Sequence, residues 1–286
     1  MNHGSIISAD LLQRHLSNPA WRIVDCRFNL IAPDDGLAQY QIEHIPNAVY
    51  AHLKHDLSAP VSSSTGRHPL PDVEQFKRKL GAWGIDNSTQ VVAYDDAAGS
   101  FAARLWWLLR WLGHKSVAVL DGGFTVWKQR SMPTTAQVPQ FAPVAFAGKP
   151  DLSMLVDTGS LEQRLKVSDV YLVDVRDPRR YLGLEEPIDT IAGHIPGAKN
   201  IPWKTNIDNK GLFLPKAQLQ THYSNLLRES PVENLVFMCG SGVTACHSLL
   251  ALDYLGLSGA KLYAGSWSEW ITDPARAVER SKDQAD

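Results

Sequence analysis

Cys239 is the residue whose surroundings most clearly indicate chemistry. It follows an apolar, strand-like run, 235–238, and precedes a segment of small residues, 240–244, after which a helix-like apolar run, 248–255, begins. A thiol at such a junction faces backbone N–H groups and the positive end of the helix dipole. Both effects favour the thiolate, which is the reactive form of cysteine, and the glycines let the loop curl around the sulfur. We therefore predict a nucleophilic cysteine.

The chain contains an internal repeat. Four short motifs occur twice, in the same order, about 143 to 150 residues apart. The pairs are WRIVDCR (21–27) with YLVDVR (171–176), HIPNA (44–48) with HIPGA (194–198), VVAYD (91–95) with LVFMC (235–239), and GGFTVW (122–127) with GSWSEW (265–270). Two copies of one domain are the simplest explanation. In this alignment Asp95 of the first copy corresponds to Cys239 of the second.

The repeat sets the domain organisation that we expect. Residues 5–130 form the first copy and residues 156–280 the second, and the proline-containing segment 131–155 forms an extended linker. Within each copy, β-branched runs alternate with amphipathic stretches. The predicted strands include 91–94, 116–120, 171–175 and 235–238, and the predicted helices include 72–83 and 215–229. This alternation predicts an α/β fold, with a parallel sheet covered by helices on both faces of each domain.

Composition narrows the function classes. The 286 residues are 44% hydrophobic and 20% charged with a formal net charge of −2, so nothing favours a nucleic-acid or membrane partner. The N-terminal residues do not resemble a secretory signal. Three cysteines without a CxxC pair argue against a disulfide scaffold or a zinc site, and they favour a reducing, cytoplasmic location. Cys26 and Cys246 are expected to be buried, Cys246 about two turns into its helix.

These residues together resemble the tandem-domain rhodaneses, in particular their 3-mercaptopyruvate sulfurtransferase branch, with thiosulfate sulfurtransferases as close relatives. The resemblance covers roughly residues 5–275. The motifs that carry it are CGSGVTA (239–245), DVRDPRRYLG (174–183), GHIPGA (193–198), DGGF (121–124) and GSW (265–267). The resemblance implies a catalytically inactive N-terminal domain and a catalytic C-terminal domain.

The resemblance also implies a mechanism. The Cys239 thiolate would take sulfur from a small anionic donor, become a persulfide, and pass the sulfur to cyanide, a small thiol or a reduced thioredoxin. The backbone N–H groups of the loop would hold the persulfide anion, as an oxyanion hole does. The loop residues are Gly240, Ser241, Gly242, Val243 and Thr244. No metal or organic cofactor is expected.

Other site residues follow from the same resemblance. Arg180 matches the arginine that binds the anionic donor, because a guanidinium can donate two parallel hydrogen bonds to a carboxylate or sulfonate. Ser241 matches a serine linked through a histidine to a carboxylate, for which His68 and Asp56 are the candidates. The segment 185–191 lacks a second arginine that the mercaptopyruvate branch carries. Thiosulfate therefore remains the alternative donor.

A cysteine phosphatase, a dinucleotide-binding protein and a sulfur-relay module are the alternative functions. A cysteine phosphatase needs an arginine six residues after the nucleophile, where this chain has Ala245. The segment 240–245 also fits a dinucleotide-binding glycine pattern, but the expected acidic residue about 20 positions later is missing. A non-enzymatic module that relays sulfur from one protein to another would use the same persulfide, and only turnover with a small donor separates it from an enzyme.

Overall fold

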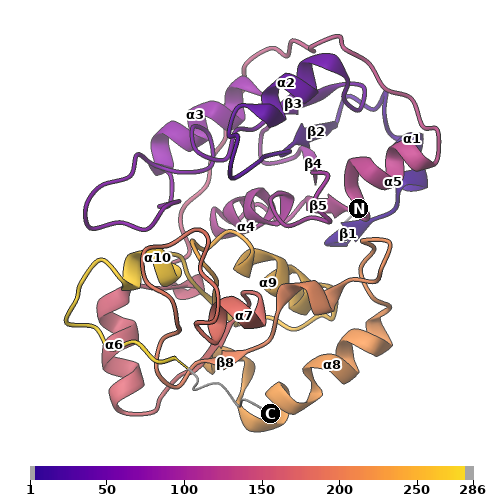
Figure 1. Cartoon of the computed structure of the whole chain (residues 1–286). Helices are drawn as coiled ribbons and strands as arrows, with labels where there is room; N and C mark the ends of the chain where they lie inside the picture. Colours follow the sequence, from indigo (N-terminus) through magenta and orange to yellow (C-terminus); the bar gives the residue numbers. More distant parts are fainter. Residues whose placement is uncertain (1–3, 281–286) are drawn as a thin grey trace. The chain divides into compact units, whose positions relative to one another are not determined.

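The computed structural model describes residues 4–280 and divides into two compact units (Figure 1). The first unit contains the chain up to Ala59, Leu70–Leu152 and Ile207–Leu214. The second unit contains Pro60–Pro69, Ser153–Asn206 and the chain from Pro215 onward. Each unit thus includes a short segment from the other half of the sequence, which the repeat did not indicate.

Strands and helices alternate in both units. The first unit contains β1 (Ile6–Ile7), α1 (Ala9–Arg14), β2 (Trp21–Asp25), α2 (Asp35–Ile42), β3 (Ala48–Tyr50), α3 (Val73–Ala82), β4 (Gln90–Tyr94), α4 (Ala102–Trp111), β5 (Val117–Leu120) and α5 (Gly123–Gln129). The second contains β6 (Leu155–Val156), α6 (Thr158–Lys166), β7 (Tyr171–Asp174), α7 (Pro178–Tyr181), β8 (Lys199–Asn200), α8 (Lys216–Glu229), β9 (Leu235–Met238), α9 (Ala245–Tyr254), β10 (Lys261–Tyr263) and α10 (Ser266–Trp270). Short 3₁₀ helices cover Leu152–Met154, Trp203–Asn206 and Val232–Asn234.

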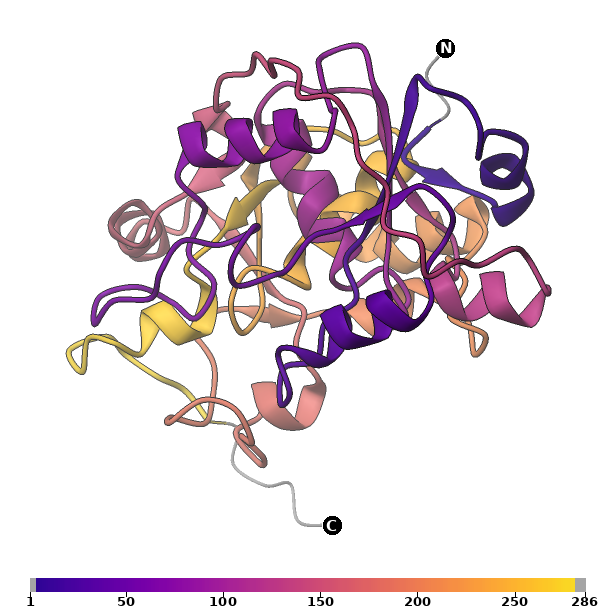
Figure 2. The same cartoon turned by 90° about the horizontal axis from the view of Figure 1, so that it is seen from above.

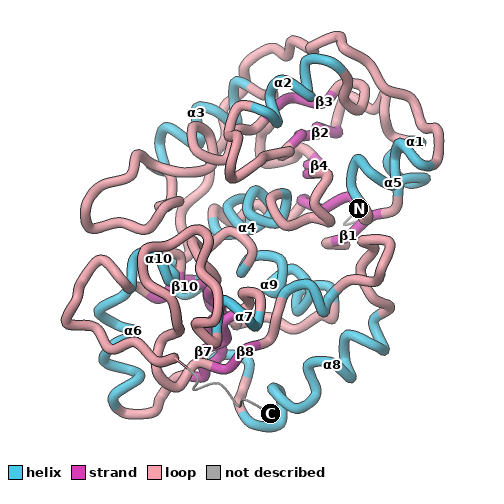
Figure 3. Tube along the Cα trace, in the orientation of Figure 1, coloured by secondary structure: helices cyan, strands magenta, loops and turns pink. Residues whose placement is uncertain are grey.

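The two sheets have the same topology. The strand order is β1-β5-β4-β2-β3 in the first unit and β6-β10-β9-β7-β8 in the second, and every pairing is parallel. The inner strands β4 and β9 are buried along their whole length, which explains why all their residues except Gln90 are apolar or aromatic. Helices flank each sheet (Figure 1, Figure 3). The predicted α/β fold with a parallel sheet in each copy is therefore confirmed.

The repeat extends to individual side-chain contacts. Arg27 Nη2 lies 2.7 Å from Asp25 Oδ2 in the first unit, and Arg176 Nη2 lies 2.7 Å from Asp174 Oδ2 in the second. All four side chains are nearly completely buried, and the Nε atom of each arginine also donates to its aspartate. Each aspartate thus fixes an arginine against the end of its own strand, twice in the same way.

A long segment after α5 has no regular secondary structure. Residues 136–150 form no helix or strand, as the prolines predict, and Figure 2 shows the chain after α5 as a long loop.

The start of α9 differs from the prediction, because this helix begins at Ala245 rather than at Ser248, where the apolar run begins. The helix therefore starts directly after the small-residue loop. No helix within residues 4–280 combines the length and the apolar composition that a membrane crossing needs.

Candidate active site

Cys239 lies directly after β9, at the edge of the sheet where parallel strands end. Its side chain is almost completely buried, with a residue exposure of 2%. Its backbone is held on both sides, because its carbonyl accepts from Trp267 N at 3.0 Å and its N–H donates to Ser266 Oγ at 3.1 Å. The following loop needs a glycine at Gly242, where φ is +72° and a Cβ atom would lie 2.3 Å from the carbonyl oxygen of Ala264.

Ser266 holds the cysteine in an unusual way. Its φ is +54°, a left-handed conformation that is costly for a residue with a Cβ atom. The corresponding residue of the first unit is Gly123, with φ +55°. The Ser266 hydroxyl accepts from Cys239 N and donates to the carbonyl of Tyr263 at 2.9 Å. Serine thus occupies a glycine position and adds a hydrogen bond to the backbone of Cys239.

Replacing Ser266 tests this arrangement. We expect Ser266→Ala to lower the free energy of unfolding by about 1–3 kcal/mol, because a buried N–H group loses its partner while the left-handed φ remains. Ser266→Gly removes the same hydrogen bond but relieves the backbone, so its loss should be smaller. Urea unfolding of both variants measures the difference. Equal losses would contradict the importance of the backbone conformation.

The first unit has a carboxylate at the position of the cysteine. Asp95 is fully buried, and its two oxygens accept four backbone N–H groups, each at 2.8 Å. The donors belong to Ala97, Gly99, Phe101 and Ala102. This loop between β4 and α4 is therefore an anion-binding loop whose anion belongs to the chain itself.

The two loops share part of their backbone geometry, although Gly99 of the first loop has φ +87° and its counterpart Val243 has no positive φ. Ala98 in the first unit has φ +55°, and Gly242, 144 residues later, has φ +72°. Asp95 and Cys239 are separated by the same 144 residues. Each also accepts a backbone N–H at its carbonyl, from Phe124 and from Trp267. The second unit thus presents a thiol where the first presents a bound carboxylate.

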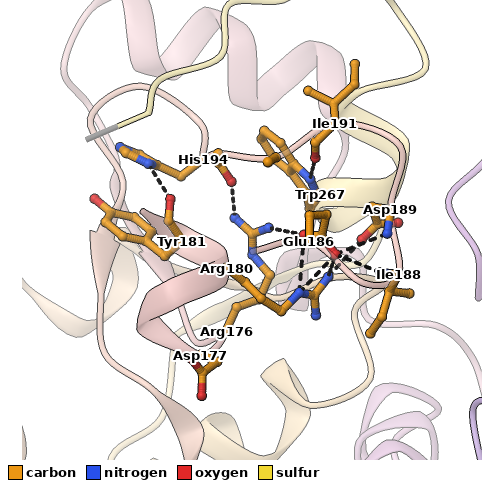
Figure 4. A network of polar contacts seen from close by, with 12 residues as sticks. Arg176, Asp177, Arg180, Tyr181, Glu186, Ile188, Asp189, Ile191, His194 and Trp267 are labelled. Atoms are coloured by element: carbon orange, nitrogen blue, oxygen red, sulfur yellow. Dashed lines mark hydrogen bonds and ion pairs between the residues drawn. The ribbon is translucent and has the colours of Figure 1, made fainter. Parts of the chain in front are cut away.

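Arg180 lies beside the loop but is not a free cation. Its Nη2 atom lies 2.7 Å from Glu186 Oε1 and 3.0 Å from Asp189 Oδ2, and both carboxylates are nearly buried (Figure 4). Its two Nη atoms are 3.6 Å from the point where a Cβ atom would lie on Gly240. The structure therefore brings the predicted arginine next to the residue after Cys239. The two carboxylates were not anticipated from the sequence.

His68 contacts the loop directly. Its Nδ1 atom lies 2.8 Å from Ser241 Oγ, and both residues are buried. The segment 60–69 that carries His68 belongs to the second unit, although it comes from the N-terminal half of the sequence. It is held there by the backbone N–H of Arg67, which donates to Ser268 Oγ at 3.0 Å. The role of this pair in the reaction remains a proposal.

Asp56 has partners within the first unit. Its Oδ2 atom accepts the backbone N–H of His52 at 2.8 Å, and its Oδ1 atom lies 2.7 Å from Lys79 Nζ. These contacts give Asp56 a local structural role. Its part in the site stays a prediction.

The remaining two cysteines are buried, as predicted. Burial raises the pKa of Cys26 well above its usual value, which disfavours the reactive thiolate form. Cys246 is the second residue of α9 rather than two turns into it, because the helix begins at Ala245, directly after the loop. Its Sγ atom lies 3.3 Å from the carbonyl oxygen of Gly242. Cys246 thus packs under the loop.

The two α/β units have one topology, and the second carries a buried cysteine at its strand–loop–helix junction, so the chain is a tandem-domain protein with a candidate thiol site in its second domain. The model of the rhodanese-like domain matches residues 8–130 and 157–273. The chain belongs to this family, and it is an enzyme of the sulfurtransferase class.

Individual relatives agree with this assignment. The chain is 48% identical over 280 residues to a "Probable 3-mercaptopyruvate sulfurtransferase" of Pseudomonas aeruginosa, covering 97% of this chain and 99% of the relative. It is 32% identical over 273 residues to the thiosulfate sulfurtransferase of Cricetulus griseus, covering 92% and 90%. Among solved structures, 3-mercaptopyruvate sulfurtransferase from Leishmania major matches with a TM-score of 0.82 and 30% identity, covering 93% of this chain and 74% of that one.

Proposed function

We propose that this chain transfers sulfur from 3-mercaptopyruvate to a nucleophilic acceptor through a persulfide on Cys239. In the first half-reaction the Cys239 thiolate attacks the donor sulfur. An S–S bond forms, the donor C–S bond breaks, and its electron pair leaves with carbon as the enolate of pyruvate, which then takes up a proton. In the second, cyanide or a thiolate attacks the outer sulfur and the Cys239 thiolate leaves.

The observation that carries the proposal is the match between the Asp95 and Cys239 loops. Four backbone N–H groups bind an anion in the first unit, and the loop around the thiol in the second unit has a left-handed residue, Gly242, at the position equivalent to Ala98. A persulfide anion on Cys239 would occupy the place of the Asp95 carboxylate. Such preorganised N–H groups stabilise charge without reorganising during the reaction.

Three further features support 3-mercaptopyruvate as the donor. The relative with 48% identity carries that substrate in its name. Arg180 next to Gly240 suits the donor's carboxylate. The hydroxyl of Ser241, hydrogen-bonded to His68, stands two residues after the nucleophile and would supply the proton that the enolate needs.

The proposal assigns different roles to the two copies. The second, within 156–280, is catalytic, and the first, within 5–130, is inactive because a carboxylate at Asp95 cannot accept sulfur; 131–155 links them. Cyanide, small thiols and reduced thioredoxin are the acceptors we expect. Three cysteines without disulfides among the described residues support a reducing, cytoplasmic location.

Parallel assays of two donors test the proposal. We expect thiocyanate formation from cyanide with a kcat/KM for 3-mercaptopyruvate about tenfold or more above that for thiosulfate. Mass spectrometry of the Cys239 peptide should show one added sulfur atom after exposure to donor and its removal by cyanide. A preference for thiosulfate would overturn the donor assignment. Turnover of neither donor would instead favour a protein-to-protein sulfur relay.

A further inference from the structure

Arg67 is a second arginine at the cysteine loop. Its Nη2 atom lies 2.6 Å from the point where a Cβ atom would stand on Gly240, closer than either Nη atom of Arg180. The position is fixed by the backbone, because Arg67 N donates to Ser268 Oγ at 3.0 Å. At the preceding residue, Gly66, a Cβ atom would lie 2.6 Å from the carbonyl oxygen of Gly265. The close docking of this segment therefore requires a glycine before Arg67.

The guanidinium of Arg67 has unused hydrogen-bonding capacity. Among the hydrogen bonds of the described residues, its side chain takes part in none, and its Nε and Nη1 atoms are buried. Its only ionic contact there is with Asp189, whose Oδ1 atom lies 3.3 Å from Nη1. An arginine offers five N–H donors. The Nη2 edge that faces Gly240 is thus available to a ligand.

Asp189 holds the two arginines together. Its Oδ1 atom faces Arg67, and its Oδ2 atom lies 3.0 Å from Arg180 Nη2. Burial raises the pKa of Asp189, whereas the positive charge of Arg67 works against that shift. One nearly buried carboxylate therefore fixes two guanidinium groups beside Gly240. We call Arg67, Arg180 and Asp189 the arginine fork.

The local charge balance depends on Arg67. The arginine fork is part of a connected cluster of ion pairs that contains three arginines and three carboxylates. Its members are Arg67, Arg176, Arg180, Asp174, Glu186 and Asp189. Without Arg67 the cluster has an excess of negative charge, which repels an anionic donor. Arg180 alone, already paired with two carboxylates, leaves the site unfavourable for an anion.

We propose that Arg67 binds the carboxylate of the sulfur donor together with Arg180 and thereby sets the preference of the site for anionic donors. This rests on the proposed function for the identity of the donor, but not for the presence of an anion site. The carboxylate accepts from the Nη edges of both guanidinium groups, while Asp189 keeps those groups side by side. Binding by two planar guanidinium groups fixes the orientation of the donor and also selects for its negative charge.

Steady-state kinetics provide the first test. We expect Arg67→Gln to lower kcat/KM for 3-mercaptopyruvate by about ten- to a hundredfold, the range of one charge-assisted hydrogen bond. The loss should fall mainly on KM, because the donor's carboxylate takes no part in the bonds that form and break. Arg179→Gln is the matched control, since Arg179 is well exposed and pairs with Glu185. Equal kinetics of the two variants would overturn the proposal.

Alkylation of Cys239 provides a test that needs no turnover. Iodoacetate is an anion and iodoacetamide is neutral, so the ratio of their rates reports the anion site beside the thiol. We expect Arg67→Gln to lower this ratio several-fold or more, Arg67→Lys to lower it less, and Arg179→Gln to leave it unchanged. The rates are followed on the Cys239 peptide by mass spectrometry.

The two tests separate the possible failures. If the unaltered protein does not turn over 3-mercaptopyruvate, the proposed donor is wrong, and the alkylation ratio still decides whether Arg67 forms an anion site. If Arg67→Gln and Arg179→Gln give the same ratio as the unaltered protein, the anion site is wrong, whatever the donor. Thermal unfolding midpoints of the three variants check that all are compared as folded proteins. Should Arg67→Gln not fold, Arg67→Lys decides: a ratio equal to that of the unaltered protein overturns the proposal.

Discussion

Replacing Cys239 with serine is expected to abolish sulfur transfer, lowering kcat by roughly a thousandfold or more. A serine hydroxyl does not ionise at neutral pH and cannot form the S–S bond of a persulfide. The replacement is nearly the same size, and the backbone of residue 239 is held by Ser266 and Trp267, so the fold should be retained. Thiocyanate formation measures the loss, and mass spectrometry should find no sulfur added to any cysteine.

Cys26→Ala is the matched control for this variant. Cys26 is buried in the first unit, and its raised pKa makes it a poor nucleophile. We expect this variant to keep the turnover of the unaltered protein per folded molecule. Substantial turnover by Cys239→Ser would mean that another cysteine receives the sulfur. In that case the match between the Asp95 and Cys239 loops would not describe the active centre.

Much of the fold could be predicted because the sequence contains two copies of the same domain. Motifs such as those around Asp25 and Asp174 recur at nearly constant spacing, and the structure gives both the same buried contact with an arginine. A strand, a small-residue loop and a helix also follow directly from the residues around Cys239. Local sequence patterns were therefore sufficient to predict where the thiol lies relative to its loop.

The surroundings of the thiol could not be predicted in the same way. Arg67 and Asp189 are 122 residues apart in the sequence, and neither lies in a motif of the repeat. Their contact depends on the docking of segment 60–69 into the second unit, a tertiary event that residue types alone do not reveal. The stretch 185–191 lacks an arginine, and what it contributes is the pair of carboxylates at Glu186 and Asp189. Which charged side chains pair with one another depends on how the chain packs, and residue types alone do not show it.

The position of Ser266 shows a second limit. Only glycine adopts left-handed φ values freely, so a serine at such a position gives no signal in the sequence. Its alignment with Gly123 becomes informative once both φ values are known. The start of α9 was also predicted at the wrong residue, for a different reason. Ala245, Cys246 and His247 break the apolar pattern only slightly, and the helix begins where the loop ends rather than where the apolar run begins.

Removal of the Asp95 carboxylate should cost more stability than any other single change considered for the first unit. We expect Asp95→Ala to lower the free energy of unfolding by about 3–5 kcal/mol, because four buried backbone N–H groups lose their acceptor together. Asp72→Ala is a useful comparison. The Asp72 side chain accepts one N–H group, from Gln75 at the start of α3, and its loss should cost about 1 kcal/mol. Urea unfolding of both variants measures the difference.

The same variant separates stability from catalysis. If the first unit binds its own carboxylate and takes no part in sulfur transfer, Asp95→Ala should unfold more easily yet turn over donor at the normal rate per folded molecule. Cys239→Ser should show the reverse, with normal stability and no turnover. The two loops occupy equivalent positions in the repeat, and they differ in the residue at the end of the strand, a carboxylate in the first unit and a thiol in the second. A loss of turnover in fully folded Asp95→Ala would refute this division, and a loss of stability no larger than that of Asp72→Ala would show that the N–H groups do not depend on the carboxylate.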